Sequence, residues 1–544
     1  MPFAPGILEN RAYLVVDDFG DMRSMIKNML MACGAGDITL ANNGADAIDQ
    51  LNDKRFDVIL CDYNLGPGKD GQQVLEEAKH RQLIGLGCVF LIVTAENARE
   101  MVMGAVEYEP DSYLTKPFNK DLLKTRLEKL IAKKQNLLPV EQALAKQNRP
   151  LAIRLLDEKI AHKPPNSNEL RKIKAEILLD AGQIGAAREV YEEVLSLRDL
   201  PWARLGLGKT LFLNKAYVEA QSQFKTITEH NPNYTAAYDW LAKCYKSLNQ
   251  LNEAQKTLEV AAKISPKAVL RQKMLGEIAL LNKDDQVAEN AFTKAVKHGR
   301  HSVYKHPSDY ANLARVSART QQGDAGLKVL KEMKREFHKD PKADLYRATA
   351  ESVVHETMGN SEAAQVCLDQ ASQIFETLDG NTDTDCSLEL AKTFQHFNKT
   401  DESVELLKST ILNNHADDDL MDEVRLTLTS AGIAEDTLGS IDALREEVAS
   451  LNRQGVELAR KGQYEEAIKL LKETSERMPA NKVVNLNAAL VMLMDMERSE
   501  FNQSRIDEIQ IYLDRVNRAE PDNPILVKLQ NRLNTVLSSN AQEG

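Results

Sequence analysis

The sequence predicts a doubly wound α/β domain with a five-stranded parallel sheet, followed by an all-α superhelix. Strand-length apolar runs alternate with segments of helical period over residues 1–135, and no such run recurs beyond them. Helical periodicity then continues almost to the end of the 544 residues, a length typical of several domains or a repeat array. Composition agrees, because 43% of the residues are hydrophobic but only 5% are aromatic, which favours Ala- and Leu-rich helices.

Five apolar runs are expected to form the sheet. They show no polar alternation, which is typical of parallel strands that helices cover on both faces. Five strands in about 120 residues fit one doubly wound domain. The runs are AYLVV at 12–16, DITLA at 37–41, DVILC at 57–61, CVFLIV at 88–93 and SYLT at 112–115.

A fixed interval of 34 residues organises the helical region. A small residue followed four positions later by an apolar one recurs at that interval, and less regular units fit the same frame on either side. This interval and these small positions resemble the tetratricopeptide repeat, whose paired helices approach closely. The resemblance covers most of residues 165–525. The strict pairs are Ala220 with Phe224, Ala254 with Leu258 and Ala288 with Phe292.

Side chains that carry chemistry stand at the ends of the predicted strands. Asp17 and Asp18 end the first strand, Asp62 the third, Thr94 the fourth and Lys116 the fifth. In an open doubly wound sheet the carboxyl ends of the strands form the ligand crevice, so these groups are expected to converge. Three carboxylates in one small site need a compensating cation, and a hard divalent ion such as Mg²⁺ suits oxygen ligands.

Four segments around these residues resemble the receiver domain of two-component response regulators. VVDD, ILCDYNLGPGKDG, LIVTAEN and DSYLTKPF match that family in order and spacing over essentially all of residues 1–130. The resemblance implies a CheY-like fold in which Asp62 accepts a phosphoryl group from the phosphohistidine of a cognate histidine kinase. It also implies Mg²⁺ bound directly by Asp18 and Asp62, through water by Asp17, and by the backbone carbonyl of Asn64.

The resemblance implies roles for three more residues. Lys116 is expected to pair with the phosphate and Thr94 to donate its hydroxyl to a phosphate oxygen, with Tyr113 following Thr94 inward. A cis bond is expected before Pro117. One segment, YEPDSY, departs from the small-residue turn that the family usually has before the fifth strand. It enlarges the surface that receivers use for partner contact, so the family's homodimer is left open here.

The pattern divides the chain into six segments. They are a receiver domain at 1–135, a degenerate helical repeat or linker at 136–165, repeats resembling tetratricopeptide repeats at 166–415, an irregular helical connector at 416–450, further repeats at 451–525, and a C-terminal capping helix and tail at 526–544.

The concave face of a repeat superhelix is lined by the first helix of each unit, and here it is expected to be basic with aromatic side chains. One hypothesis is that this groove binds an acidic peptide or a chain-terminal carboxylate through charge-assisted hydrogen bonds. The alternative is a solvated charged face. The residues in question are Trp202, Lys209, Phe212, Lys243, Lys246, Lys273, Arg315 and Arg319.

Two further motifs are interpreted as structural. Residues 206–210, GLGKT, have the tail of a phosphate-binding loop, but residue 203 is Ala where that loop needs Gly, and no strand precedes it. Gly208 is instead expected to be a small helix-packing position. His298, His301 and His306 are expected to be solvated residues of an inter-repeat loop rather than metal ligands.

Several function classes are disfavoured. With 69 Lys and Arg against 81 Asp and Glu, the net charge of −12 disfavours nucleic-acid binding, and no apolar run is long enough to span a membrane. The six cysteines form no C-x-x-C pair, which indicates a reducing cytoplasm. No signature of an enzymatic or DNA-binding output domain is found.

The sequence therefore predicts a bacterial, cytoplasmic response regulator whose phosphorylation at Asp62 switches protein binding by the repeats. Two alternatives stay open. The receiver is an accessory that modulates phosphoryl flow by holding the kinase or a sibling regulator, or the chain is a constitutive scaffold.

Overall fold

The protein is described by a computed structural model that divides into two compact units, Met1–Asp309 and Tyr310–Gly544. Of the predicted motifs, Glu96 and Asn97 of LIVTAEN and Tyr108 of YEPDSY lie outside the described residues. The structure describes residues 6–95, 109–378, 384–430, 432–433, 435–498, 502–521 and 523–543.

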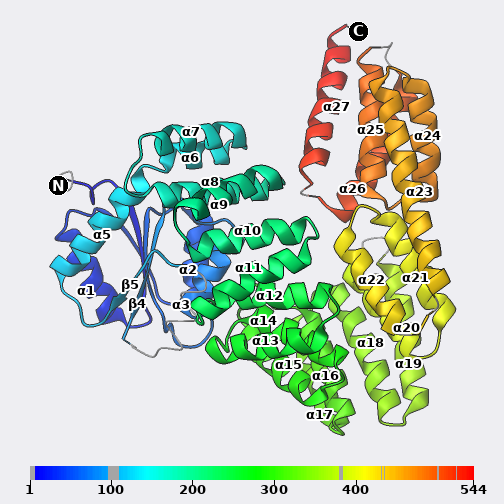
Figure 1. The fold of residues 1–544 in the computed structure, drawn as a ribbon, viewed down its shortest axis with the longest axis horizontal. Helices are drawn as coiled ribbons and strands as arrows, with labels where there is room; N and C mark the ends of the chain where they lie inside the picture. The colour runs from blue at the N-terminus through cyan, green and yellow to red at the C-terminus, as the bar shows by residue number, and fades with distance from the viewer. Residues whose placement is uncertain are drawn as a thin grey trace. The chain divides into compact units, whose positions relative to one another are not determined.

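A five-stranded parallel sheet forms the start of the first unit, as predicted (Figure 1). Its strand order is β2-β1-β3-β4-β5, which is typical of a doubly wound sheet. All strands are parallel, and the order in which they are added to the sheet reverses between β1 and β3. Each strand lies within one residue of its predicted run. The strands are β1 (Ala12–Val16), β2 (Asp37–Ala41), β3 (Val58–Asp62), β4 (Val89–Thr94) and β5 (Ser112–Thr115).

Helices cover both faces of the sheet because successive strand side chains point to opposite sides. Tyr13 and Val15 of β1 pack with the helices of one face, α1 (Gly20–Met31) and α5 (Lys120–Gln135). Leu14 and Val16 pack with the helices of the other, α2 (Gly44–Asp53) and α3 (Gly71–His80). The side chains of Tyr13, Leu14, Val15 and Val16 are at most 1% exposed, so a continuous apolar run was the correct signal for β1.

Side-chain caps fix where three of these helices begin. Asn43 and Asn119 accept backbone N–H groups at the starts of α2 and α5. Asp70 forms a capping box with Gln73 at the start of α3. The Lys116-Pro117 bond before α5 is cis, as expected.

Helical pairs follow the sheet to the end of the first unit. They are α6 (Leu138–Ala145), α7 (Arg149–Ala161), α8 (Ser167–Asp180), α9 (Ile184–Leu197), α10 (Pro201–Leu213), α11 (Tyr217–His230), α12 (Thr235–Ser247), α13 (Leu251–Ile264), α14 (Val269–Leu281) and α15 (Asp285–Gly299).

Small residues let the paired helices touch, as the repeat frame predicts. A Cβ atom on Gly208 of α10 would lie 2.5 Å from the ring of Phe224 in α11, and one on Gly276 of α14 would lie 2.7 Å from the ring of Phe292 in α15. Residues 206–210 are therefore helix interior rather than a phosphate-binding loop.

The second unit is also built from helices in its described residues. Ala364 and Ala467, each followed four positions later by a leucine as in the repeat frame, are fully buried. In the described part of the chain, no helix is both long and apolar enough to cross a membrane. The helices are α16 (Pro307–Arg319), which begins in the first unit, α17 (Gly323–Glu336), α18 (Pro341–Thr357), α19 (Ser361–Thr377), α20 (Thr384–His396), α21 (Thr400–Asn413), α22 (Asp418–Ser430), α23 (Glu435–Arg460), α24 (Tyr464–Arg477), α25 (Lys482–Met496), α26 (Gln503–Ala519) and α27 (Pro524–Glu543).

Candidate functional site

Three carboxylates gather at the carboxyl end of the sheet. Asp17 and Asp18 follow β1 and Asp62 ends β3, and each of the three offers an oxygen atom within 4.8 Å of the others. Strands β1 and β3 are paired, with Val16 opposite Cys61, so the residues that follow lie side by side. Asp17 and Asp62 are buried, whereas Asp18 is exposed to solvent. The predicted convergence of these residues is therefore present in the fold.

Lys116 forms ion pairs with two of the three carboxylates and supplies one positive charge to them. Its Nζ lies 2.8 Å from Oδ2 of Asp17 and 2.9 Å from Oδ2 of Asp62. Its backbone N–H donates to the carbonyl of Thr94, which fixes the end of β5 against the end of β4. One ammonium thus bridges two strands that lie apart in the sequence.

The electrostatics of the cluster are those of a partly compensated anionic site. Burial raises the pKa of the Asp62 carboxyl, against the opposing hydrogen bond and charge of Lys116. Burial alone would lower the pKa of the Lys116 ammonium, but its bonds to Asp17 and Asp62 outweigh burial and raise it. The site therefore retains a demand for further positive charge.

The donor set fits a hard divalent cation. Three carboxylates on one side and solvent on the other leave coordination places for water and for an incoming anion. Asn64, predicted to contribute its backbone carbonyl, lies exposed two residues after Asp62. Its role as a ligand stays a prediction.

Thr94 lies in β4, the strand next to that of Asp62, and Tyr113 lies in β5, one strand further along the sheet. Thr94 ends β4 and is 8% exposed. The Tyr113 hydroxyl of β5 is buried, with no hydrogen-bond partner among the described residues, and burial raises its pKa. Tyr113 therefore already points inward in this structure, where it packs with the α2 and α3 side of the sheet.

Two glycines that follow β3, one in the loop and one at the start of α3, shape the site and were not identified from the sequence. Gly66 has φ +71°, and a Cβ there would lie 3.3 Å from Oδ2 of Asp18. A Cβ on Gly71 would lie only 2.1 Å from the carbonyl oxygen of Asp62. The first residue of α3 thus rests directly on the backbone of Asp62. The GPGKDG segment is the signal that points to this loop.

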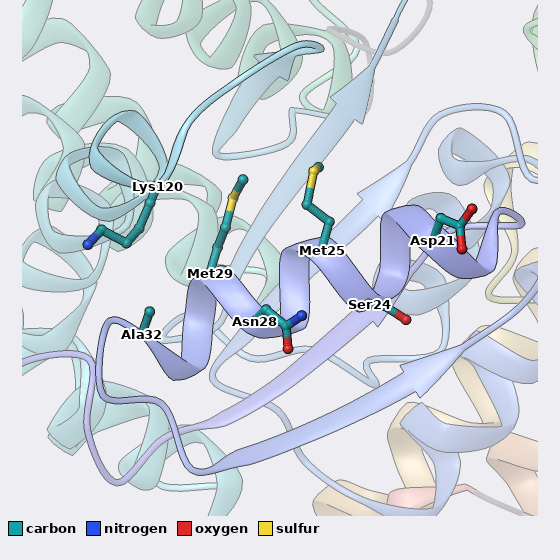
Figure 2. Close-up of a pocket in the computed structure, with 7 residues that line it drawn as sticks. All are labelled: Asp21, Ser24, Met25, Asn28, Met29, Ala32 and Lys120. Atoms are coloured by element: carbon teal, nitrogen blue, oxygen red, sulfur yellow. The ribbon is translucent and has the colours of Figure 1, made fainter.

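A shallow depression of about 530 Å³ runs along α1 on the covering layer of the sheet (Figure 2). Met25 and Met29 project from α1 on the same side in Figure 2, and Lys120 lines the depression from the start of α5. The depression includes none of the three clustered carboxylates. We assign it no chemistry.

Three of the residues predicted for the basic groove surround Trp240, a residue that sequence reasoning missed. The Nζ atoms of Lys209 and Lys243 lie 5.4 Å and 4.4 Å from the centre of the indole, and the Phe212 ring meets it edge-on at 5.4 Å. Burial lowers the pKa of Lys209. The structure thus brings together three of the eight predicted residues.

The other predicted groove residues lie elsewhere or are engaged. Trp202 packs edge-on against Tyr191, and Lys246 is exposed. Lys273 forms an ion pair with Asp309 at 3.0 Å. The remaining two belong to α16 in the second unit, where Arg315 pairs with Glu389 and Arg319 is exposed.

The interpretation of the three histidines needs a correction. His298 belongs to the last turn of α15 rather than to a loop, and burial lowers its pKa. His301 and His306 follow in the connection to α16. Instead of being solvated throughout, this segment contacts the sheet domain: the carbonyls of His298 and His301 accept hydrogen bonds from Gln73 and Lys69.

The fold and the site define a signal-receiver class, a doubly wound domain with an acidic cluster bridged by a lysine. The chain belongs to the response regulators. Residues 13–128 match the response regulator receiver domain, and residues 178–239 and 211–277 match the tetratricopeptide repeat.

Two curated relatives resemble the receiver. The chain is 34% identical over 128 residues to chemotaxis protein CheY-3 of Vibrio cholerae, covering 22% of this chain and 92% of that protein. It is also 34% identical over 123 residues to chemotaxis protein CheY of Pseudomonas aeruginosa, covering 22% and 93%.

Among solved structures, the Francisella response regulator 1452 receiver domain is 29% identical and covers 23% of this chain and 98% of its own, with a TM-score of 0.21. MamA 41-end from Desulfovibrio magneticus RS-1 is 24% identical and covers 31% and 94%, with a TM-score of 0.27.

Proposed function

We propose that Asp62 accepts a phosphoryl group from a histidine kinase with Mg²⁺ as cofactor, and that the repeats bind a protein partner. One observation carries this proposal: Lys116 bridges Asp17 and Asp62 in a cluster whose third carboxylate, Asp18, faces solvent. Such a cluster has a carboxylate nucleophile, a fixed ammonium and room for a cation in one crevice.

In the proposed transfer, a carboxylate oxygen of Asp62 attacks the phosphorus of a phosphohistidine. The O–P bond forms, the P–N bond breaks, and its electron pair returns to the imidazole ring. Lys116 is already held within 2.9 Å of Asp62 and stays close to the phosphoryl oxygens as they arrive. Asp18 and Asp62, together with Asp17, would hold Mg²⁺, which when bound would supply positive charge for the transfer.

The proposed output is protein binding rather than a second reaction. The match to tetratricopeptide repeats and the cluster around Trp240 support it, because repeat arrays present extended binding surfaces. All six cysteines are free thiols, which supports the proposed reducing cytoplasm.

Acetyl phosphate tests the phosphoacceptor. With Mg²⁺, intact-mass measurement should show one added phosphoryl group per chain, and a chelator or Asp62→Asn should abolish it. Asp53→Asn, which changes an exposed aspartate at the end of α2, is the matched control and should keep the label. Retained labelling in Asp62→Asn would remove the assignment.

A further inference from the structure

Helix α3 carries polar residues that a helix on a protein surface would leave in water. Gln72, Glu76 and Glu77 are 5%, 4% and 8% exposed. The repeats of the first unit cover Glu76 and the neighbouring Gln73, which form hydrogen bonds with Ser302 and with the carbonyl of His298. Glu77 is instead paired within the sheet domain, with Lys69 and Arg81. Burying a carboxylate is costly unless it is paired, so the contacts that cover α3 need to be specific.

Hydrogen bonds join α3 to the segment after α15. Ser302 Oγ donates to Oε2 of Glu76 at 2.7 Å in a buried contact. The side-chain amide of Gln73 donates to the carbonyl of His298 at 3.0 Å, and Lys69 Nζ to that of His301 at 2.9 Å. Residues more than 200 positions apart thus form one polar interface.

A second group of contacts lies beside the phosphoacceptor. Lys267, which precedes α14, stands over the ring of Tyr63 at 5.3 Å and donates to its hydroxyl at 3.4 Å. The same Nζ lies 3.8 Å from Oδ2 of Asp70. Tyr63 is the next residue after Asp62, so a cation of the repeats reaches the immediate neighbour of the proposed phosphorylation site.

The C-terminal end of α3 also makes contacts that link it to the repeats. Lys79 donates to the carbonyl of Glu109, and Glu109 places both carboxylate oxygens on Lys172 of α8, at 2.8 and 2.9 Å. His80 meets the ring of Tyr304 edge-on at 5.3 Å. The repeats therefore contact α3 along its whole length, from the phosphoacceptor loop to its last residue.

The start of α3 is in direct backbone contact with Asp62 and Tyr63. The backbone N–H of Gly71 donates to the carbonyl of Tyr63 at 2.8 Å, and Gly71 has no room for a Cβ against the carbonyl of Asp62. A change at Asp62 therefore reaches Asp70 and α3 through close backbone contacts rather than through a flexible loop.

We propose that α3 is the element through which the repeats sense the receiver, and that a phosphoryl group on Asp62 tightens this contact. The second half rests on the proposed function. Phosphorylation adds about one negative charge beside Tyr63, and Lys267 is the cation of the repeats that contacts Tyr63. The added attraction favours the docked arrangement of α3 on the repeats.

The docking contact is tested in the full chain without phosphorylation. Ser302→Asp places a carboxylate against buried Glu76 yet still accepts the N–H of Tyr304 that Ser302 now holds, so the local turn is retained. Hydrogen exchange of the α3 amides should become about tenfold faster. The second substitution Glu76→Gln should reverse this, because the amide can donate to the new carboxylate.

Ser222→Asp, on the exposed face of α11, is the control and should leave exchange in α3 unchanged. Exchange in α3 that does not respond to Ser302→Asp, or that Glu76→Gln fails to restore, would overturn the docking contact.

Coupling is tested by adding acetyl phosphate and Mg²⁺, with intact mass counting phosphoryl groups. Exchange in α3 and in residues 298–304 should slow several-fold per phosphorylated chain, and Lys267→Ala should remove that difference. Lys256→Ala, an exposed lysine of α13, should preserve it. A phosphorylated chain with unchanged or faster exchange would overturn the coupling, whereas a chain that takes no phosphoryl group would overturn the proposed function and leave the Ser302 result standing.

Discussion

At the scale of single residues, Asp62, the proposed nucleophile, lies where its negative charge is disfavoured. Burial raises its pKa, and neighbouring Asp17 acts in the same direction, against Lys116. The native state therefore binds a proton at Asp62 more tightly than the unfolded chain does. The free energy of unfolding consequently falls as pH rises from the ordinary carboxyl pKa through the raised one, and the loss persists at neutral pH.

Replacing Asp62 by Asn is therefore expected to stabilise the metal-free protein at pH 7 by about 1 kcal/mol, because the variant has no charge to bury there. Urea unfolding with a chelator measures it, and the advantage should shrink toward pH 4. Mg²⁺ should stabilise the parent more than the variant. An Asn variant that is less stable than the parent at pH 7 with chelator would contradict the electrostatic account, and Asp53→Asn serves as control.

Gly71 packs against the backbone of Asp62 and leaves no room for a side chain there. Gly71→Ala should destabilise the protein by about 2 kcal/mol or more, because the new methyl group would stand 2.1 Å from a backbone oxygen that cannot rotate away. Gly185→Ala on α9 is the matched control: nothing lies within 4 Å of its Cβ position, and a helical Gly→Ala exchange should stabilise slightly. Thermal unfolding of both variants measures the difference. Equal melting temperatures would show that the backbone after β3 moves to make room for the methyl group at little cost.

At the scale of elements, the helical pairs depend on fully buried alanines. Ala254→Leu and Ala288→Leu should each cost about 1–3 kcal/mol, since both positions are 0% exposed where paired helices touch. In a repeat array the loss should also reach the neighbouring units. Asn252→Leu on the exposed face of α13 gives the control, and parent-like melting of both alanine variants would contradict the repeat frame.

The elements and the acidic cluster were predictable because local patterns determine them. The continuous apolar run CVFLIV marked a fully buried strand to within a residue, and parallel strand order brings Asp17, Asp62 and Lys116 to one edge. Gly71 was missed because its contact with Asp62 joins backbone to backbone and leaves no periodic signal. Trp240 was missed because its flanking lysines come from different helices, α10 and α12.

At the scale of the whole molecule, the cluster around Trp240 is the place to test ligand binding by the repeats. A fluorescent hexaglutamate peptide should bind more weakly to the double variant Lys209→Glu, Lys243→Glu, and binding should also weaken as salt rises, because screening acts over about 10 Å at 0.1 M. Lys256→Glu with Lys283→Glu is the exposed control pair. Binding that ignores both salt and charge reversal would favour the solvated-face interpretation.

The docking of the receiver on the repeats could not be foreseen from the sequence. It joins residues such as Ser302 and Glu76, and Lys267 and Tyr63, through side-chain complementarity between segments 226 and 204 positions apart. Periodicity reports which face of a helix is buried against its neighbours in the chain. It carries no information about which distant element will cover a polar face.

Helix α3 has one side in the interior of the sheet domain and the other against the repeats, and this limits how interchangeable the receiver is. A receiver grafted from a relative would bring its own acidic cluster and lysine, and so its own phosphoryl chemistry. It would also bring an α3 with a foreign outer face. In such a chimera the grafted receiver would contact the repeats as the parent does only if it kept Tyr63, Gln73 and Glu76 of this chain. A working exchange of receivers would therefore have to leave the outer face of α3 in place, and could not simply replace everything up to the end of α5.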